Sequence, residues 1–213
     1  MSNQLLRTIL TIPAILVGFT FHEYAHAKVA DILGDKTPRF QGRLTLNPIT
    51  HIDPIGFLMI LICRFGWAKP VQINRSAFKD PYKDDLKVSL AGPIANLIVA
   101  ILGAILYKVY IEIFSSIELS SQVSLVLGLI SIIIKMIYIM NVYLFIFNLL
   151  PVPGLDGFAI IEDLFPNFFL QIEEKVDRYK FIIFIAIIYF GGSIISYPGE
   201  VIISLIERLL GII

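Results

Sequence analysis

The sequence has 213 residues, of which 57% are hydrophobic and 16% are charged. Soluble domains typically contain about 45–50% apolar and about 25% charged residues, so this composition indicates an integral membrane protein rather than a soluble one. The 17 basic and 17 acidic residues balance, which gives no reason to expect nucleic acid as a partner. Cys63 is the only cysteine, so no internal disulfide can form.

The first apolar segment, Leu5 to Leu33, is long enough to span a bilayer with some tilt. The polar stretch that follows alternates over residues 39–46, which predicts a strand. Asp53 followed by Pro54 is typical of a helix N-cap with proline in the first turn. The apolar run that begins there is short for a span, so we expect it to be re-entrant or buried against other helices.

Residues 67–74 predict a second extended segment, so a small β-hairpin or re-entrant element is expected near residues 39–74. Residues 88–107 predict a transmembrane helix, and residues 123–150 predict a longer one. A mixed stretch then leads to an apolar tail, residues 181–213, whose glycines and proline fit either one kinked span or a helical hairpin.

These segments predict an all-α polytopic membrane protein with about four to six transmembrane helices. No linker or low-complexity stretch divides the chain, so residues 1–213 are expected to form a single membrane-embedded domain. Its core is expected over about residues 5–160, with C-terminal membrane segments over residues 181–213.

The basic residues predict the orientation of these segments in the membrane. Nine of the 17 fall between Lys36 and Lys87, and none lies in the loop near residues 111–121. The positive-inside rule therefore places the first region in the cytosol and the loop outside. The loop after Leu150 then returns to the cytosolic side, where the C-terminal end of the first helix also lies.

The sharpest chemical signal is the HExxH motif from His22 to His26 within the first apolar segment. Two histidines four residues apart project from one face of a helix and can bind one zinc ion, while Glu23 can act as general base toward water that the zinc activates. The alternative is a pair of structural histidines. Ionisable groups inside a membrane segment are costly unless something compensates them, and a bound dication does so.

Zinc hydrolases usually use three protein ligands and leave one position to water. Here the third ligand is either His51 or a carboxylate. Asp156 is the strongest carboxylate candidate, because it lies in a Pro/Gly-rich turn after an apolar helix. The predicted topology also puts it on the same side of the membrane as the C-terminal end of the HExxH helix. The alternative is an ordinary turn aspartate before Gly157.

These motifs together resemble those of a known family. HExxH in an early transmembrane helix, followed by the sequence NLLPVPGLDG from Asn148 to Gly157, resembles the site-2 protease family of intramembrane zinc metalloproteases. The likeness extends over most of residues 15–160. It includes the GPIAN sequence that ends at Asn96 and the LNPITHIDPIG sequence over residues 46–56, as in short prokaryotic members without a PDZ-type domain.

The resemblance implies one zinc ion held by His22, His26 and Asp156, with Glu23 as the general base. It also implies that Asn148 orients the substrate or stabilises the oxyanion. The protein would be a multi-pass prokaryotic cell-membrane protein with its site nearer the cytosol. Its partners would be the lipid bilayer and transmembrane or membrane-adjacent protein substrates.

Two residues near these motifs have open roles. His51 is either a proton donor or gate near the metal, or a loop histidine beside an N-cap. Asn96 is interpreted as packing or hydrogen bonding near the site and not as a ligand, because it follows small residues that let helices pack closely. The strand-like stretches 39–46 and 67–74 offer an edge for an unwound substrate, or are a surface hairpin.

The predicted function is therefore zinc-dependent hydrolysis of peptide bonds in or next to transmembrane segments. A membrane metal-ion transporter is one alternative, since paired histidines and carboxylates in a membrane can also pass ions. The later apolar segments carry few polar groups for such a path. A catalytically inactive relative that binds membrane clients is the other alternative, although every catalytic residue type is present.

Overall fold

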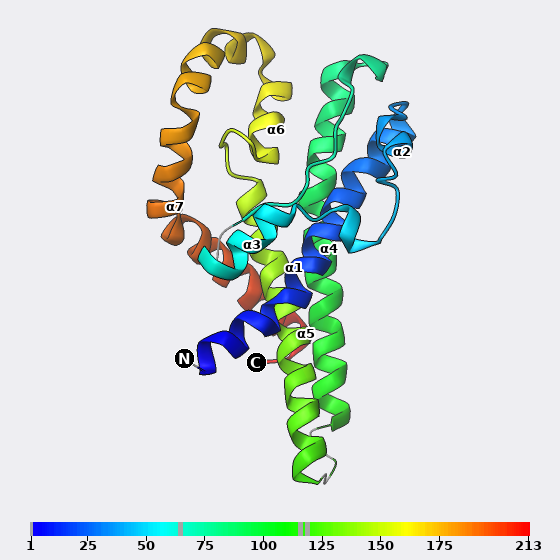
Figure 1. The fold of residues 1–213 in the computed structure, drawn as a ribbon, viewed down its shortest axis with the longest axis vertical. Coiled ribbons are helices and arrows are strands. Elements are labelled where there is room, and N and C mark those ends of the chain that lie inside the picture. The colour runs from blue at the N-terminus through cyan, green and yellow to red at the C-terminus, as the bar shows by residue number, and fades with distance from the viewer. Residues whose placement is uncertain (1, 64–65, 115–116, 118–119) are drawn as a thin grey trace.

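The computed structural model describes residues 2–63, 66–114, 117 and 120–213, and these are mostly helical (Figure 1). The long helices are α1 (Ser2–Leu33), α4 (Pro81–Phe114), α5 (Ser121–Asn148) and α7 (Pro166–Leu210), and the short elements are α2 (Thr37–Phe40), η1 (Pro48–Thr50), α3 (Pro54–Cys63), η2 (Arg75–Ala77) and α6 (Asp156–Leu164).

The all-α membrane architecture expected from the composition is confirmed. Three helical segments in the described part of the chain are long and apolar enough to cross a bilayer. They are Thr8–Leu33 in α1, Pro81–Phe114 and Ser121–Asn148. The expected total of four to six spans is not established by these three.

Helices α1, α4 and α5 pack against one another in pairs, and Figure 1 shows α1 crossing the long α4–α5 hairpin. Small residues allow the close approach. A Cβ atom added at Gly18 would lie 2.5 Å from the Leu144 side chain of α5, and one added at Gly103 would lie 3.1 Å from the Cβ atom of Tyr138. In a bilayer, where apolar surface gains little from leaving lipid, such close packing is a main source of helix association.

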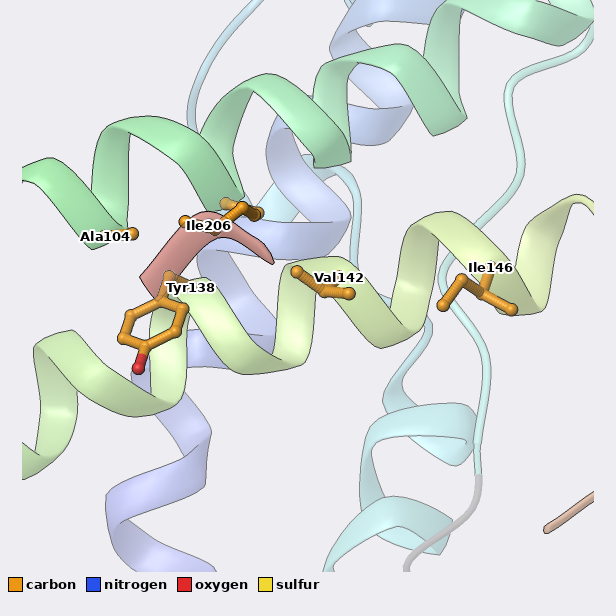
Figure 2. Close-up of a cluster of buried hydrophobic side chains, with 6 residues drawn as sticks. Ala104, Tyr138, Val142, Ile146 and Ile206 are labelled. Atoms are coloured by element: carbon orange, nitrogen blue, oxygen red, sulfur yellow. The ribbon is translucent and has the colours of Figure 1, made fainter. Parts of the chain in front are cut away.

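A buried apolar cluster joins the C-terminal end of α7 to this bundle (Figure 2). It contains Ala104 of α4, Tyr138 and Val142 of α5, and Ile206 of α7. The Tyr138 hydroxyl, on a fully buried side chain, donates to Oε1 of Glu207 at 2.5 Å. The end of α7 is therefore fixed on α4 and α5 by both packing and a partly buried hydrogen bond.

The predicted strand at residues 39–46 does not form, because Thr37–Phe40 is the helix α2. Asp35 accepts a hydrogen bond from the Thr37 N–H at 2.8 Å, and Asp31 accepts two from the Arg39 guanidinium at 2.8 and 2.7 Å. These side-chain contacts favour a helical turn over the strand that the alternation suggested.

The second predicted strand, residues 67–74, is extended but does not form the expected hairpin. In the described part of the chain it makes one antiparallel bridge, between Ile52 and Ala68. The predicted N-cap before α3 is confirmed, since Asp53 accepts from the Gly56 N–H at 2.7 Å. Helix α3 crosses the middle of the view in Figure 1.

Two helices extend beyond their predicted limits. Helix α4 begins at Pro81 rather than Val88, because Asp80 caps it by accepting from the Lys83 N–H at 3.3 Å, in polar sequence that hydropathy ignores. The apolar tail belongs to one helix, α7, which passes through Pro198 and bends in Figure 1. Of the two alternatives for the apolar tail, the single kinked helix is therefore observed and the helical hairpin is not.

Candidate metal centre

The structure brings together the three residues that the sequence singled out as metal ligands. His22 and His26 project from one face of α1, and Asp156 is the first residue of α6, placed by the turn that ends α5. The two Nε2 atoms lie 3.0 Å apart. Oδ2 of Asp156 is 3.2 Å from Nε2 of His22, and Oδ1 is 3.3 Å from Nε2 of His26.

The hydrogen-bond partner of Nδ1 in each imidazole determines which ring nitrogen carries the hydrogen. Nδ1 of His26 lies 2.7 Å from the Val88 carbonyl oxygen, which can only accept, so this Nδ1 is the donor. Nδ1 of His22 lies 2.8 Å from Oδ1 of Asn96 and is likewise the donor. In the neutral rings both Nε2 atoms therefore present lone pairs to each other and to the Asp156 carboxylate.

Three acceptor groups thus converge without a donor between them. Oδ2 of Asp156 is buried and has no hydrogen-bond partner among the described residues. Buried acceptors facing one another are unfavourable unless a metal ion or a proton lies among them. Ligands of a tetrahedral zinc ion, at about 2.0–2.1 Å, are about 3.3 Å apart, and the observed separations of 3.0 to 3.3 Å fit that spacing.

Helix α4 packs directly against the two imidazoles and so forms the floor of the centre. This close approach is possible only because residue 92 is glycine. A Cβ atom there would lie 2.2 Å from Nε2 of His26 and 2.5 Å from Cε1 of His22. Both imidazoles are buried. The GPIAN sequence therefore contributes twice, since Gly92 makes room for the histidines and Asn96 binds one of them.

A cavity of about 750 Å³ opens beside the centre. Its walls are mostly apolar and come from α1, from the extended segment before η2, from the C-terminal end of α5 and from the turn after it, with Phe19, Trp67, Phe147 and Leu155 among them. Asn148 also lines it, and Nδ2 of this residue donates to the Leu144 carbonyl at 2.9 Å. The cavity has the size and polarity typical of sites for apolar ligands with few polar contacts.

Glu23 faces the same cavity and is held by the extended segment. Its Oε2 accepts a hydrogen bond from the Val71 N–H at 2.9 Å and lies 3.9 Å from Nη2 of Arg43. The Arg43 guanidinium is buried and donates to the carbonyls of Thr50 and Lys69. Arg43 thus joins the loop that contains Thr50 to the extended segment that contains Lys69, directly next to Glu23.

His51 is not among the three candidate ligands and lies near Arg43 and Lys69 instead. It is fully buried, its Nε2 donates to the Thr45 carbonyl at 2.7 Å, and its own carbonyl accepts from the Lys69 N–H at 2.9 Å. Its Nδ1 has no hydrogen-bond partner within the described part of the chain. Burial, and to a smaller extent the nearby Arg43 charge, lowers the pKa of His51, so the neutral ring is favoured.

A charged cluster joins α4 to α6 at the edge of the cavity. Arg75 of η2 donates to Asp85 at 2.5 Å and to Glu162, and it lies 3.5 Å from Asp163. Burial, followed by repulsion from Asp85, raises the pKa of Asp163 to about 7 despite the Arg75 charge. The cluster links the helix that carries Asp156 to the helix that forms the floor of the centre.

The sequence interpretation missed Arg43 and the role of Asn141. Arg43 lies in a polar stretch, where nothing in the sequence indicates burial. Asn141 was visible as a polar residue in an apolar segment, and an intramembrane polar residue is a sign of function. In the structure it is fully buried, and its Oδ1 accepts from Nδ2 of Asn96 at 2.9 Å.

Comparisons with known proteins found a matching family model and a similar bacterial protein. The family model described as peptidase family M50 matches residues 10–191. The chain is 43% identical over 185 residues to a Bacillus subtilis (strain 168) protein named "Putative zinc metalloprotease YwhC", an alignment that covers 86% of this chain and 82% of the relative. No solved structure matches this chain.

Proposed function

Because this chain belongs to peptidase family M50, the site-2 protease family, and is a membrane zinc metalloprotease, we propose that it cleaves peptide bonds in or next to transmembrane segments of membrane-protein substrates. The carrying observation is the convergence of three acceptors, His22, His26 and Asp156, with no donor among them. The apolar cavity beside them supports a substrate of membrane origin.

His22, His26 and Asp156 would hold the zinc ion in this proposal. The spacing of their atoms, the buried position of both imidazoles and the glycine floor support it. A zinc ion at this site supplies Lewis acidity, which polarises a peptide carbonyl and makes water a stronger acid. The hydrogen bonds on the two Nδ1 atoms orient the imidazoles for that purpose.

Glu23 would be the general base. It lines the cavity next to the proposed ligands. The Val71 N–H donates to its Oε2 at 2.9 Å and Nη2 of Arg43 lies 3.9 Å from the same oxygen, so both contacts hold the carboxylate in place. An ionised carboxylate can accept the proton of the attacking water and deliver it to the leaving nitrogen as the peptide bond breaks. His51 would act on this step indirectly, by supporting the segment that carries Val71.

Asn148 would stabilise the negative charge that develops on the scissile carbonyl oxygen. Its amide group lines the cavity at the end of α5 and has two N–H donors, of which one is bonded to the Leu144 carbonyl. The second can donate to substrate. A donor that faces developing charge in a site of low polarity is among the largest contributions to catalysis.

In this proposal the centre lies nearer the cytosolic face of a prokaryotic cell membrane, and the distribution of the basic residues supports this orientation. Nine of the 17 basic residues lie in the region from residue 36 to residue 87, between α1 and the apolar part of α4. A single-span substrate would then be cut toward its cytosolic end. Its helix must unwind first, since a helical backbone hides the scissile carbonyl in its own hydrogen bonds.

A cleavage assay with single-span substrates in detergent or liposomes tests the proposal. We expect the native protein to cut, and the Glu23→Gln variant to bind zinc without cutting. Glu112→Gln, at a side chain that is 62% exposed near the end of α4, is the matched control and should cut normally. Cleavage by Glu23→Gln at the native rate would contradict the assignment of the base.

A further inference from the structure

We infer that Asn141 of α5 is a positioning residue that sets the tautomer of His22 through Asn96. It would keep the lone pair of the His22 ring on the nitrogen that faces the metal. The inference rests on the proposed role of His22 as a ligand. Asn141 touches none of the proposed ligands or Glu23 by hydrogen bond, and its effect passes through one intermediate side chain.

The chain of hydrogen bonds starts at a backbone carbonyl. The amide group of Asn141 places one terminal atom 2.7 Å from the Ile137 carbonyl oxygen. Because a carbonyl oxygen only accepts, that atom must be the nitrogen Nδ2. Oδ1 of Asn141 is therefore the atom that faces Asn96, at 2.9 Å. The helix backbone thereby removes the freedom of this amide to flip.

The same logic then fixes Asn96. Its Nδ2 lies 2.9 Å from Oδ1 of Asn141 and 3.1 Å from the Gly18 carbonyl oxygen, so both of its N–H groups have acceptors. Oδ1 of Asn96 is left to face Nδ1 of His22 at 2.8 Å. That nitrogen must donate, and Nε2 of His22 is left with a lone pair directed at the centre.

The two proposed histidine ligands are fixed in different ways. Nδ1 of His26 bonds directly to a backbone carbonyl, that of Val88, and needs no side chain to define its tautomer. His22 faces an amide side chain, whose orientation depends on the partners of its two N–H groups. Without Asn141, the Gly18 carbonyl at 3.1 Å would still accept from one of these N–H groups, but the other would be buried without an acceptor, which weakens the preference of Asn96 for this orientation.

Burial makes this relay effective. Asn96 and Asn141 are both fully buried, so water does not compete for their hydrogen bonds, and bonds in such surroundings are electrostatically stronger. The relay also joins α1, α4 and α5, which a purely structural role would explain equally well. The tautomer of His22 is the property that distinguishes the two roles.

Nitrogen NMR on zinc-free protein labelled with 15N-histidine measures that tautomer directly. The chain has only three histidines, and spectra recorded at alkaline pH show which nitrogen of each neutral ring carries the hydrogen. We expect His22 of the native protein to carry its hydrogen on Nδ1. A native His22 with its hydrogen on Nε2 would overturn the inference without any variant.

Three variants complete the test. Asn141→Leu removes the acceptor for Asn96, and we expect a mixture of His22 tautomers and a zinc affinity lower by about tenfold. Asn141→Asp can repeat both hydrogen bonds when its carboxyl group is protonated, and in that form it should behave as the native protein does. Val142→Ala, at a fully buried neighbour, controls for loss of packing and should leave the tautomer unchanged. His26 serves as the internal reference.

The outcomes separate the inference from the proposed function. If native protein binds zinc through His22 but Asn141→Leu leaves both the tautomer and the zinc affinity unchanged, the relay is wrong and the metal site stands. If Val142→Ala shifts the tautomer as much as Asn141→Leu does, the effect is general packing and the relay is also wrong. If native zinc binding does not depend on His22, the proposed metal site itself fails.

Discussion

Replacing Gly92 by alanine tests whether α4 shapes the metal centre. The new Cβ atom would lie 2.2 Å from Nε2 of His26, whereas an ordinary contact is at least 3.4 Å, so the ring or the helix must move by about 1.2 Å. Zinc sites tolerate errors of only about 0.2 Å in ligand distance. Overpacking of this kind also costs about 1–3 kcal/mol of stability.

We therefore expect Gly92→Ala to lower zinc affinity by more than about 100-fold. Elemental analysis and chelator competition on detergent-purified protein measure the affinity, and thermal unfolding measures the stability. Gly103→Ala is the control on the same helix, since its Cβ would lie 3.1 Å from Tyr138 and away from the centre. It should lose a little stability and keep its zinc. Native zinc affinity in Gly92→Ala would refute the reasoning.

Three further predictions concern groups around the cavity. Asn148→Ala should lower kcat by about 10²–10³-fold with zinc content unchanged, and an unchanged kcat would exclude it as the oxyanion donor. Arg43→Lys should lower cleavage roughly tenfold while zinc is retained, because an ammonium cannot bridge two carbonyls as the guanidinium does; native cleavage would show that the bridge is dispensable. Asp163→Asn should gain stability relative to the native protein as pH rises from about 4 to about 7, and a difference independent of pH in thermal unfolding would contradict this.

The sign of the Asp163 effect follows from its raised pKa. Its pKa rises from 3.8 to about 7 on folding, so the folded state binds the proton more tightly than the unfolded state does. Deprotonation therefore costs stability as pH rises through this window, and the cost is complete above the folded pKa. An asparagine at this position does not titrate, so the Asp163→Asn variant does not lose this stability as pH rises.

The sequence predicted the helices that are defined by continuous apolar residues. The segments corresponding to α1, α4 and α5 have this property, so hydropathy found them, but it found only the apolar part of α4. The polar first turns of that helix depend on the Asp80 cap, which hydropathy does not detect. The predicted strand at residues 39–46 failed for a similar reason, since contacts from Asp31 and Asp35 decided the local structure.

The candidate ligands could be predicted because their signals are local. His22 and His26 share a helical face by spacing alone, and Asp156 stands out in its turn. Arg43 and Asn141 could not be assigned, because their partners are remote in the sequence. The Arg43 partner Lys69 and the Asn141 partner Asn96 become neighbours only when the chain folds.

The central claim is that His22, His26 and Asp156 hold a catalytic zinc ion while Glu23 remains free to act as base. Zinc stoichiometry, measured by elemental analysis on detergent-purified protein, tests it most directly. The account predicts about one zinc per chain in the native protein and in Glu23→Gln, and loss of zinc in His22→Ala and Asp156→Ala. A well-folded native protein without zinc, or zinc content indifferent to His22→Ala, would contradict it.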